Sequence, residues 1–265
     1  MDVRDLVRGY YGSDAGLTAN ILRVLSSAGI AVDRLRPADL FAIDHLHAGG
    51  VTATQYVLER LGVVPDQRLL DVGSGVGGPA RMAAMSGATV TGVDLTPEFV
   101  AAATELTDLV GLNERALFVA APAESLPFDD DSFDAAMMVH AGMNIANKKA
   151  VFAEVHRVLL PGSRFALYDQ VATGAGEVPY PMPWAEDQRT SFLETLEAYS
   201  GFLKAAGFFI EGIDDRTESI LGPRPDAPAV SPVDVYGPVY ALGVSNYVAA
   251  AKSGVLRAVL ILATA

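Results

Sequence analysis

The sequence predicts an α/β protein built on a doubly wound, seven-stranded, mostly parallel sheet with an N-terminal helical cap. First, short apolar runs alternate with amphipathic stretches from about residue 67 onward, which is typical of a parallel sheet covered by helices. Second, four glycines lie within residues 73–78, directly behind an apolar run. Third, the chain has 265 residues, 51% of them hydrophobic and none of them cysteine, which suffices for one large core without disulfides.

The first half of the predicted sheet contains three strands. Pro79 favours a helix start after the first strand, because the first residue of a helix needs no partner for its N–H group. Thr96 is expected to cap the second helix, which ends at Gly111. The three expected strands are residues 68–73, 88–94 and 116–121.

The second half of the predicted sheet contains four strands. A helix capped by Asn147 separates the fourth strand from the fifth. Ser191 is expected to form a capping box with Glu194 and to begin a helix that ends at Ala206. Another helix, over 232–252, separates the last two strands. The expected strands of this half are residues 133–139, 163–169, 208–215 and 256–264.

Three segments make up the predicted domain organisation. Residues 1–60 carry apolar side chains at helical spacing and are expected to form the helical cap, while residues 61–265 form the core. Within the core, residues 170–190 contain several glycines and prolines and show no periodicity. Long connections of this kind are commonly functional. We therefore expect residues 170–190 to form a lid over the ligand site.

Composition argues against several classes of protein. A net charge of −13 with scattered basic residues would repel a phosphate backbone, so nucleic acid is not an expected partner. No apolar run approaches the roughly 18 residues that cross a membrane, and residues 1–12 alternate charged with apolar side chains, unlike a signal peptide. We expect a cytoplasmic protein without a membrane partner. A homodimer is compatible with the sequence, which does not fix the oligomeric state.

The glycine-rich stretch is the first chemical motif. Gly73, Gly75 and Gly78 satisfy GxGxxG between a strand and a helix, so backbone N–H groups are expected to face a ligand. On this spacing alone, a tight turn without a ligand is the alternative. Asp94 ends the second strand 21 residues after Gly73, where a carboxylate accepts the hydroxyls of a ribose. The motif therefore predicts a nucleoside ligand.

Two classes of cofactor contain such a nucleoside, namely dinucleotides and S-adenosylmethionine. Asp71 lies two residues before Gly73, and its negative charge would oppose a pyrophosphate. The same charge would attract the ammonium and sulfonium groups of S-adenosylmethionine, directly or through water. Asp71 therefore favours S-adenosylmethionine as the cofactor.

Three sequence blocks now carry a resemblance to a known family. They are LLDVGSGVGG, VTGVDLTPEF, and the run AAPAESLPFDDDSFDAAMMVHAGMNI followed by AEVHRVLLPGSRFALYD. Over roughly residues 40–260 the chain resembles the class I S-adenosylmethionine-dependent methyltransferases, which have a Rossmann-like sheet. The segments DHLHAGG and PYPMPWA are similar to those of bacterial small-molecule enzymes, including sarcosine/dimethylglycine and natural-product methyltransferases. The resemblance implies the strand order 3-2-1-4-5-7-6.

The resemblance also implies roles in binding the cofactor. It places the loop against the methionine end, Asp94 on the ribose, Leu95 on the adenine face, and Ala123 and Glu124 beside the adenine ring. The chain departs from the family at Pro122, where an Asp usually receives the adenine amino group. The expected cofactor-binding residues are Asp71, Gly73, Ser74, Gly75, Asp94, Leu95, Ala123, Glu124, His140 and Tyr11.

Candidate residues for catalysis and for the acceptor follow from position. His140 follows the fourth strand, and His47 occupies the place where the family motif has a histidine, so both are candidate proton acceptors. The alternatives are a polar plug at a strand end for His140 and a structural role in the cap for His47. The expected acceptor-binding residues are His47, Asn144, Tyr180, Trp184 and Tyr236, although a core stripe is the alternative for Tyr236.

The predicted function is S-adenosylmethionine-dependent methyl transfer to the N, O or C atom of a small molecule, with a hydrophobic secondary metabolite preferred. Alternatives are a sarcosine/dimethylglycine-type N-methyltransferase, a dinucleotide-dependent oxidoreductase and a cofactor-binding scaffold without turnover. No metal site is expected, because the three acids Asp129, Asp130 and Asp131 lie in a turn typical of the family and are read as solvated. The acceptor and the use of a general base stay open.

Overall fold

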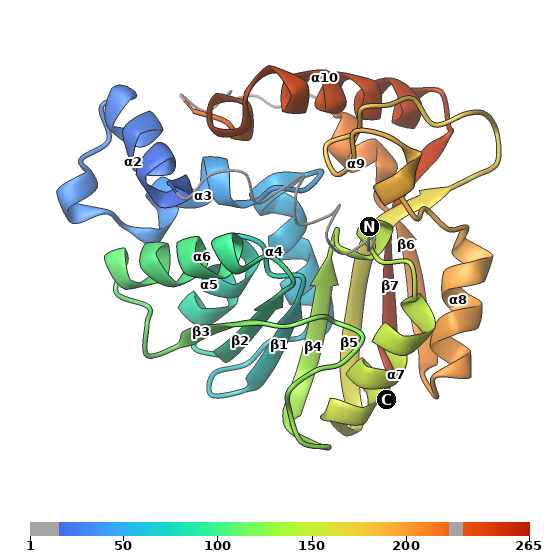
Figure 1. Ribbon diagram of the computed structural model, residues 1–265. Coiled ribbons are helices and arrows are strands. Elements are labelled where there is room, and N and C mark those ends of the chain that lie inside the picture. The colour runs from blue at the N-terminus through green and yellow to red at the C-terminus, as the bar shows by residue number, and fades with distance from the viewer. Residues whose placement is uncertain (1–15, 223–229) are drawn as a thin grey trace.

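The computed structural model describes residues 16–222 and 230–265. Its centre is a seven-stranded sheet in the order β3-β2-β1-β4-β5-β7-β6 (Figure 1). Strand β7 is antiparallel to both of its neighbours, and the other pairs are parallel. The predicted fold class and strand order are confirmed. The strands are β1 (Arg68–Val72), β2 (Thr89–Asp94), β3 (Ala116–Ala120), β4 (Phe133–Val139), β5 (Leu159–Ala172), β6 (Phe209–Asp215) and β7 (Leu256–Thr264).

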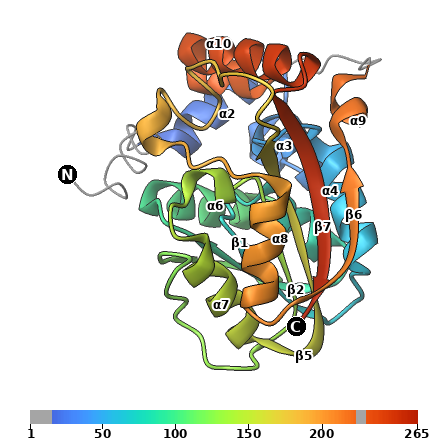
Figure 2. The same cartoon turned by 90° about the vertical axis from the view of Figure 1, so that its right-hand side faces the viewer.

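Helices cover both faces of the sheet because side chains alternate along each strand. In β1, Leu70 and Val72 pack with α7 (Lys148–Val158) and α8 (Leu196–Ala205) on one face. Leu69 faces the opposite side, where α4 (Gly50–Leu61) and α5 (Gly78–Met85) pack. Figure 2 shows α7 and α8 together on their face. The other helices that contact the sheet are α4 (Gly50–Leu61), α5 (Gly78–Met85), α6 (Pro97–Leu109), α9 (Thr217–Leu221) and α10 (Pro232–Lys252).

Three elements lie above the carboxyl ends of the strands. They are α2 (Leu17–Ser27), α3 (Pro37–Asp44) and α10, which crosses the top of the molecule (Figure 1). The Asn20 side chain donates to the Val235 carbonyl at 2.9 Å and so ties α2 to the start of α10. The predicted division of the chain at residue 60 stays a prediction. Short 3₁₀ turns occur at Val32–Arg34, Gly142–Asn144 and Gln188–Thr190.

One helix start was predicted wrongly. Helix α8 begins at Leu196 rather than near Ser191, and its cap is Thr195, whose hydroxyl accepts from the Ala198 N–H. The residues before it are held in extended form, because Phe192 donates its N–H to the Met143 carbonyl and Glu194 forms a parallel bridge with β5. Pairing with β5 therefore outweighs the local capping signal. In the described residues, no helix is long and apolar enough to span a bilayer.

Candidate functional site

A cavity of about 1860 Å³ lies at the carboxyl ends of β1, β2 and β4. Residues that follow these strands form its floor, and residues of α3 and α10 form other walls. The connection after β5 contributes Trp184 and Arg189. Pockets for one drug-sized ligand are typically about 300–1000 Å³. The cavity is therefore large enough for a nucleoside cofactor and a second molecule together.

The glycine loop forms the floor next to β1. Gly73 has φ +76°, and a Cβ there would lie 2.3 Å from the Cβ of Ala141, so only glycine fits. The N–H groups of Gly73 and Ser74 donate to the Val93 carbonyl at 2.7 and 3.0 Å. The N–H of Gly75 donates to Asp94. The N–H groups of Gly73, Ser74 and Gly75 are therefore taken by β2, whereas the expectation that N–H groups at the start of α5 face a ligand stays a prediction.

Asp94 is fixed in place at the end of β2. Its Oδ2 accepts from the Gly75 N–H at 2.8 Å and its Oδ1 accepts from the Thr96 N–H at 2.9 Å. Burial raises the pKa of this carboxyl, and hydrogen bonds from the backbone of Thr96, Gly75 and Leu95 and from the Thr96 side chain oppose that rise. Asp94 lines the cavity at the end of β2, where a carboxylate can accept the hydroxyls of a ribose.

Two buried polar atoms beneath the loop have no hydrogen-bond partner. They are Oδ2 of Asp71 and Oγ of Ser74. Burial, together with the nearby charge of Asp94, raises the pKa of Asp71 to about 7. Buried polar atoms are normally paired, so these two fit a ligand that brings a cationic group to the loop. With Asp94 for the ribose, the residues present fit the nucleoside and amino-acid ends of S-adenosylmethionine.

His140 lies at the end of β4 with φ +51°. Its ring Nε2 is 3.0 Å from the side-chain amide nitrogen of Gln170. The backbone N–H of His140 donates to the Tyr168 carbonyl at 2.8 Å. Burial lowers the pKa of His140 to about 3. The imidazole is therefore neutral near pH 7 and is a weak base. A fixed, neutral ring is better suited to orienting an acceptor than to removing its proton.

His47 has both ring nitrogens engaged within the chain. Its Nε2 lies 2.9 Å from the hydroxyl of Thr54, and its Nδ1 lies 3.3 Å from the carbonyl oxygen of Ala48. Burial and the neighbouring histidines hold its pKa well below the usual value. The rings of His47 and His140 are 5.6 Å apart. The structure thus brings the two predicted histidines together, while the hydrogen bonds of His47 support a structural role.

A third histidine was missed as a candidate. His45 lines the cavity, and its Nδ1 lies 2.6 Å from the carboxylate of Asp44, which also accepts from Arg81 at 3.0 Å. The Nε2 of His45 is buried without a partner. The available signal was Arg81, a charged residue in the otherwise apolar helix GPARMAAM. A buried arginine requires a partner, and Asp44 in DHLHAGG supplies it.

The connection after β5 forms the wall opposite the cofactor residues. Asn144 donates from Nδ2 to the carbonyls of Trp184 and Thr190 at 2.8 and 3.1 Å. Trp184 is buried, lines the cavity and donates from Nε1 to Ser191 at 3.0 Å. Tyr180 is not among the lining residues and packs against the cluster that contains Trp184. Trp184 and Asn144 therefore form a fixed wall.

The remaining predicted residues divide into two groups. Leu95, Ala123, Glu124 and Tyr236 line the cavity. Tyr11 lies outside the described residues. The cavity therefore brings together residues that follow β2, β3 and β4 and residues of α10, whereas the predicted Asp71 is not among its lining residues.

The lining of the cavity is acidic. Among the described lining residues, Arg189 is the single lysine or arginine, and its guanidinium is bound to Asp187 through Nε and Nη2 at 2.6–3.0 Å. The acidic lining residues are Asp44, Asp94, Glu124, Glu186 and Asp187. On the walls formed by the described residues, an anionic second ligand would find no unpaired lysine or arginine.

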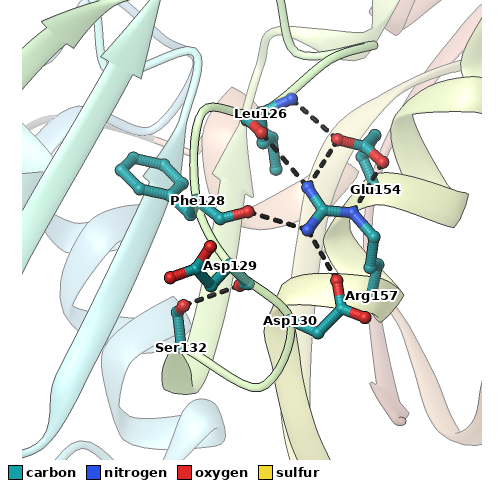
Figure 3. Close-up of polar contacts among 7 residues, drawn as sticks. All are labelled: Leu126, Phe128, Asp129, Asp130, Ser132, Glu154 and Arg157. Carbon is teal, nitrogen blue, oxygen red and sulfur yellow. Dashed lines mark hydrogen bonds and ion pairs between the residues drawn. The ribbon is translucent and has the colours of Figure 1, made fainter.

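The acidic turn that precedes β4 lies at the amino end of that strand, whereas His140 lies at its carboxyl end. Arg157 fills this turn: it donates to the Phe128 carbonyl at 2.7 Å and to Asp130 at 2.8 Å, and it pairs with Glu154 (Figure 3). The Ser132 hydroxyl donates to the Asp129 carbonyl at 2.6 Å. This turn is thus held by an arginine. Over residues 16–222 and 230–265 no cluster of three acids or histidines suited to a metal ion occurs.

Comparisons with known proteins give relatives and a structural neighbour. A methyltransferase-domain family matches residues 70–167. Methyltransferase GfsG of Streptomyces halstedii is 34% identical over 200 residues, which cover 73% of this chain and 70% of that protein. Methyltransferase phqN of Penicillium fellutanum is 32% identical over 64% of this chain, which spans about half (53%) of that relative.

One structural neighbour is geranyl diphosphate C-methyltransferase from Streptomyces coelicolor A3(2), solved with Mg²⁺, geranyl-S-thiolodiphosphate and S-adenosyl-L-homocysteine. It has a TM-score of 0.72 and 17% identity, covering 100% of this chain and 98% of that one. The likeness extends over the whole length of both chains and supports the shared fold.

Proposed function

This chain belongs to the class I S-adenosylmethionine-dependent methyltransferases, and we propose that it methylates a large hydrophobic small molecule that is neutral or cationic, such as a secondary metabolite. The observation that carries the proposal is the charge distribution of the cavity. At the cofactor end, Oδ2 of the buried Asp71 lacks a hydrogen-bond partner, and the N–H groups of Gly73, Ser74 and Gly75 are already bonded to β2.

When bound, the cofactor supplies an electrophilic methyl group: the acceptor forms a bond to the methyl carbon while the carbon–sulfur bond breaks, leaving a neutral thioether. The residues of the chain would bind the cofactor and the acceptor and orient them toward each other. Asp94 would hold the ribose, Asp71 would balance the cationic end, and His140, which lines the cavity, would contact the acceptor. Orientation of this kind contributes on the order of 7–11 kcal/mol in well-aligned reactions. Because His140 is a weak base, we propose that it orients the acceptor and that any proton is released to water.

The acceptor class follows from the second half of the cavity. Its walls combine apolar side chains such as Trp184 and Met143 with acidic ones, and the Arg189 guanidinium is already paired. A carboxylate or phosphate on the acceptor would therefore be repelled. This argues against sarcosine and dimethylglycine, which both carry a carboxylate. It also argues against a dinucleotide, whose pyrophosphate would meet Asp71 at the loop.

We expect a panel of acceptors to separate these functions. With cofactor labelled in the methyl group, neutral or basic hydrophobic acceptors are expected to take up label. Sarcosine, dimethylglycine and a prenyl diphosphate are expected to give at most background. Transfer to sarcosine or dimethylglycine alone would contradict the proposed acceptor class. Cofactor binding without transfer to any of a broad panel would instead favour a scaffold without turnover.

Binding of the cofactor should depend on pH through Asp71. Its pKa of about 7 means that the carboxyl loses its charge as the pH falls, and with it the attraction to the cationic end. Affinity for S-adenosylmethionine is therefore expected to fall about fivefold from pH 7 to pH 6, measured by calorimetry. Asp71→Asn is expected to bind weakly with no such slope. A slope of the same size in Asp71→Asn would assign the titration to another group.

A further inference from the structure

Tyr236 lies at the start of α10, on the cofactor side of the cavity. Its side chain packs against a cluster that contains Val76 of the glycine loop and Phe99 of α6. The backbone of α10 breaks at Gly237, where φ is 79° and ψ is −165°. The turn before this break is tied to α2 through Asn20 and the Val235 carbonyl. This turn is thus a separate unit fixed above the loop.

The hydroxyl of Tyr236 is buried and has no hydrogen-bond partner in the described chain. Buried tyrosine hydroxyls usually find one. The ring centre of Tyr240 lies 5.5 Å from that of Tyr236. Burial raises the pKa of Tyr236, and Tyr240, Asp44 and Asp94 raise it further. The hydroxyl therefore stays protonated and is a hydrogen-bond donor. The described chain leaves it without an acceptor.

We propose that the Tyr236 hydroxyl donates a hydrogen bond to the nucleoside part of S-adenosylmethionine, so that the first turn of α10 covers the cofactor and not the acceptor. The inference rests on the proposed function. It changes the role predicted for Tyr236, which was acceptor binding. Its grounds are that this buried, unpaired hydroxyl belongs to a side chain that lines the same cavity as Asp94, the proposed ribose acceptor, and packs against the cluster that contains Val76 of the glycine loop.

Calorimetry with Tyr236→Phe tests the inference without any acceptor. The variant is expected to bind S-adenosylmethionine and S-adenosylhomocysteine about 5–10-fold more weakly, the effect of one lost hydrogen bond. Methylthioadenosine, which keeps the nucleoside and lacks the amino-acid end, is expected to lose affinity by the same factor. Tyr56→Phe is the control, because Tyr56 bonds Asp214 away from the cavity, and its cofactor affinity should match the wild type.

Thermal unfolding separates a binding role from a structural one. Removing an unpaired buried hydroxyl should leave the unliganded variant as stable as the wild type or slightly more stable, while the shift in Tm caused by the cofactor becomes smaller. Unchanged affinity in Tyr236→Phe would overturn the inference. So would a loss for S-adenosylmethionine without a loss for methylthioadenosine, or a lower Tm without cofactor. A wild-type protein that ignores S-adenosylmethionine would refute the proposed function itself.

Discussion

Asp94→Ala is expected to weaken the binding of S-adenosylmethionine by about 100-fold or more. The carboxylate has two functions, because it would accept ribose hydroxyls while it holds the N–H groups of Gly75 and Thr96 at 2.8 and 2.9 Å. Hydrogen bonds to a charged group contribute about 1.5–3 kcal/mol each, and 1.4 kcal/mol corresponds to a tenfold change in affinity. Loss of the ribose contacts together with a loosened loop is therefore expected to lower the affinity for S-adenosylmethionine by two orders of magnitude. Calorimetric titration measures this directly.

Two further variants make the Asp94 experiment specific. Asp94→Asn keeps one carbonyl oxygen as an acceptor and is expected to fall between Asp94→Ala and the wild type. Asp130→Ala removes an acid from the turn at the far edge of the sheet, where it pairs with Arg157, and should bind the cofactor normally. Near-normal affinity of Asp94→Ala would mean that the nucleoside is bound elsewhere.

The fold was predictable from the sequence because each parallel strand is a short apolar run bounded by turn residues. The strands at 88–94 and 133–139 coincide with the expected segments to within one residue. The start of α8 was not predictable in this way, because the bridge of Glu194 to Val171 joins residues that are distant in the sequence. Local capping signals cannot indicate such a pairing.

The site was predictable as a location more than as chemistry. Parallel strands place the residues that follow them at the same end of the sheet, so Asp94 and His140 were both expected beside one ligand site, and both line the cavity. The destination of the loop N–H groups depends on the register of β1 against β2, which brings the Val93 carbonyl beneath Gly73. The charge state of His140 depends on burial, which the sequence does not give. The contact between Asp44 and His45 could not be predicted, because it depends on how the segment before α4 folds.

The buried ion pair between Asp44 and Arg81 gives the largest expected effect on stability. Both side chains are 1% exposed. The Arg81 guanidinium donates to Asp44, to the Val76 carbonyl and to Thr107, and thereby joins α3, the glycine loop and α6. Removing one partner of a buried pair costs about 3–5 kcal/mol, because the other charge is left without compensation. Arg81→Met is therefore expected to lower the free energy of unfolding by that amount in urea denaturation.

The comparison variants distinguish the uncompensated charge from the loss of packing. In the double variant Arg81→Met with Asp44→Asn no charge is left buried, so it should recover part of the loss. Arg68→Met is the matched control: Arg68 pairs with Asp134 at 2.8 Å but is 49% exposed, and exposed pairs contribute about 0–1 kcal/mol. Equal losses in Arg81→Met and Arg68→Met would contradict the argument. Since Arg81 holds the Val76 carbonyl, Arg81→Met should also weaken cofactor binding under conditions where it is folded, whereas Arg68→Met should not.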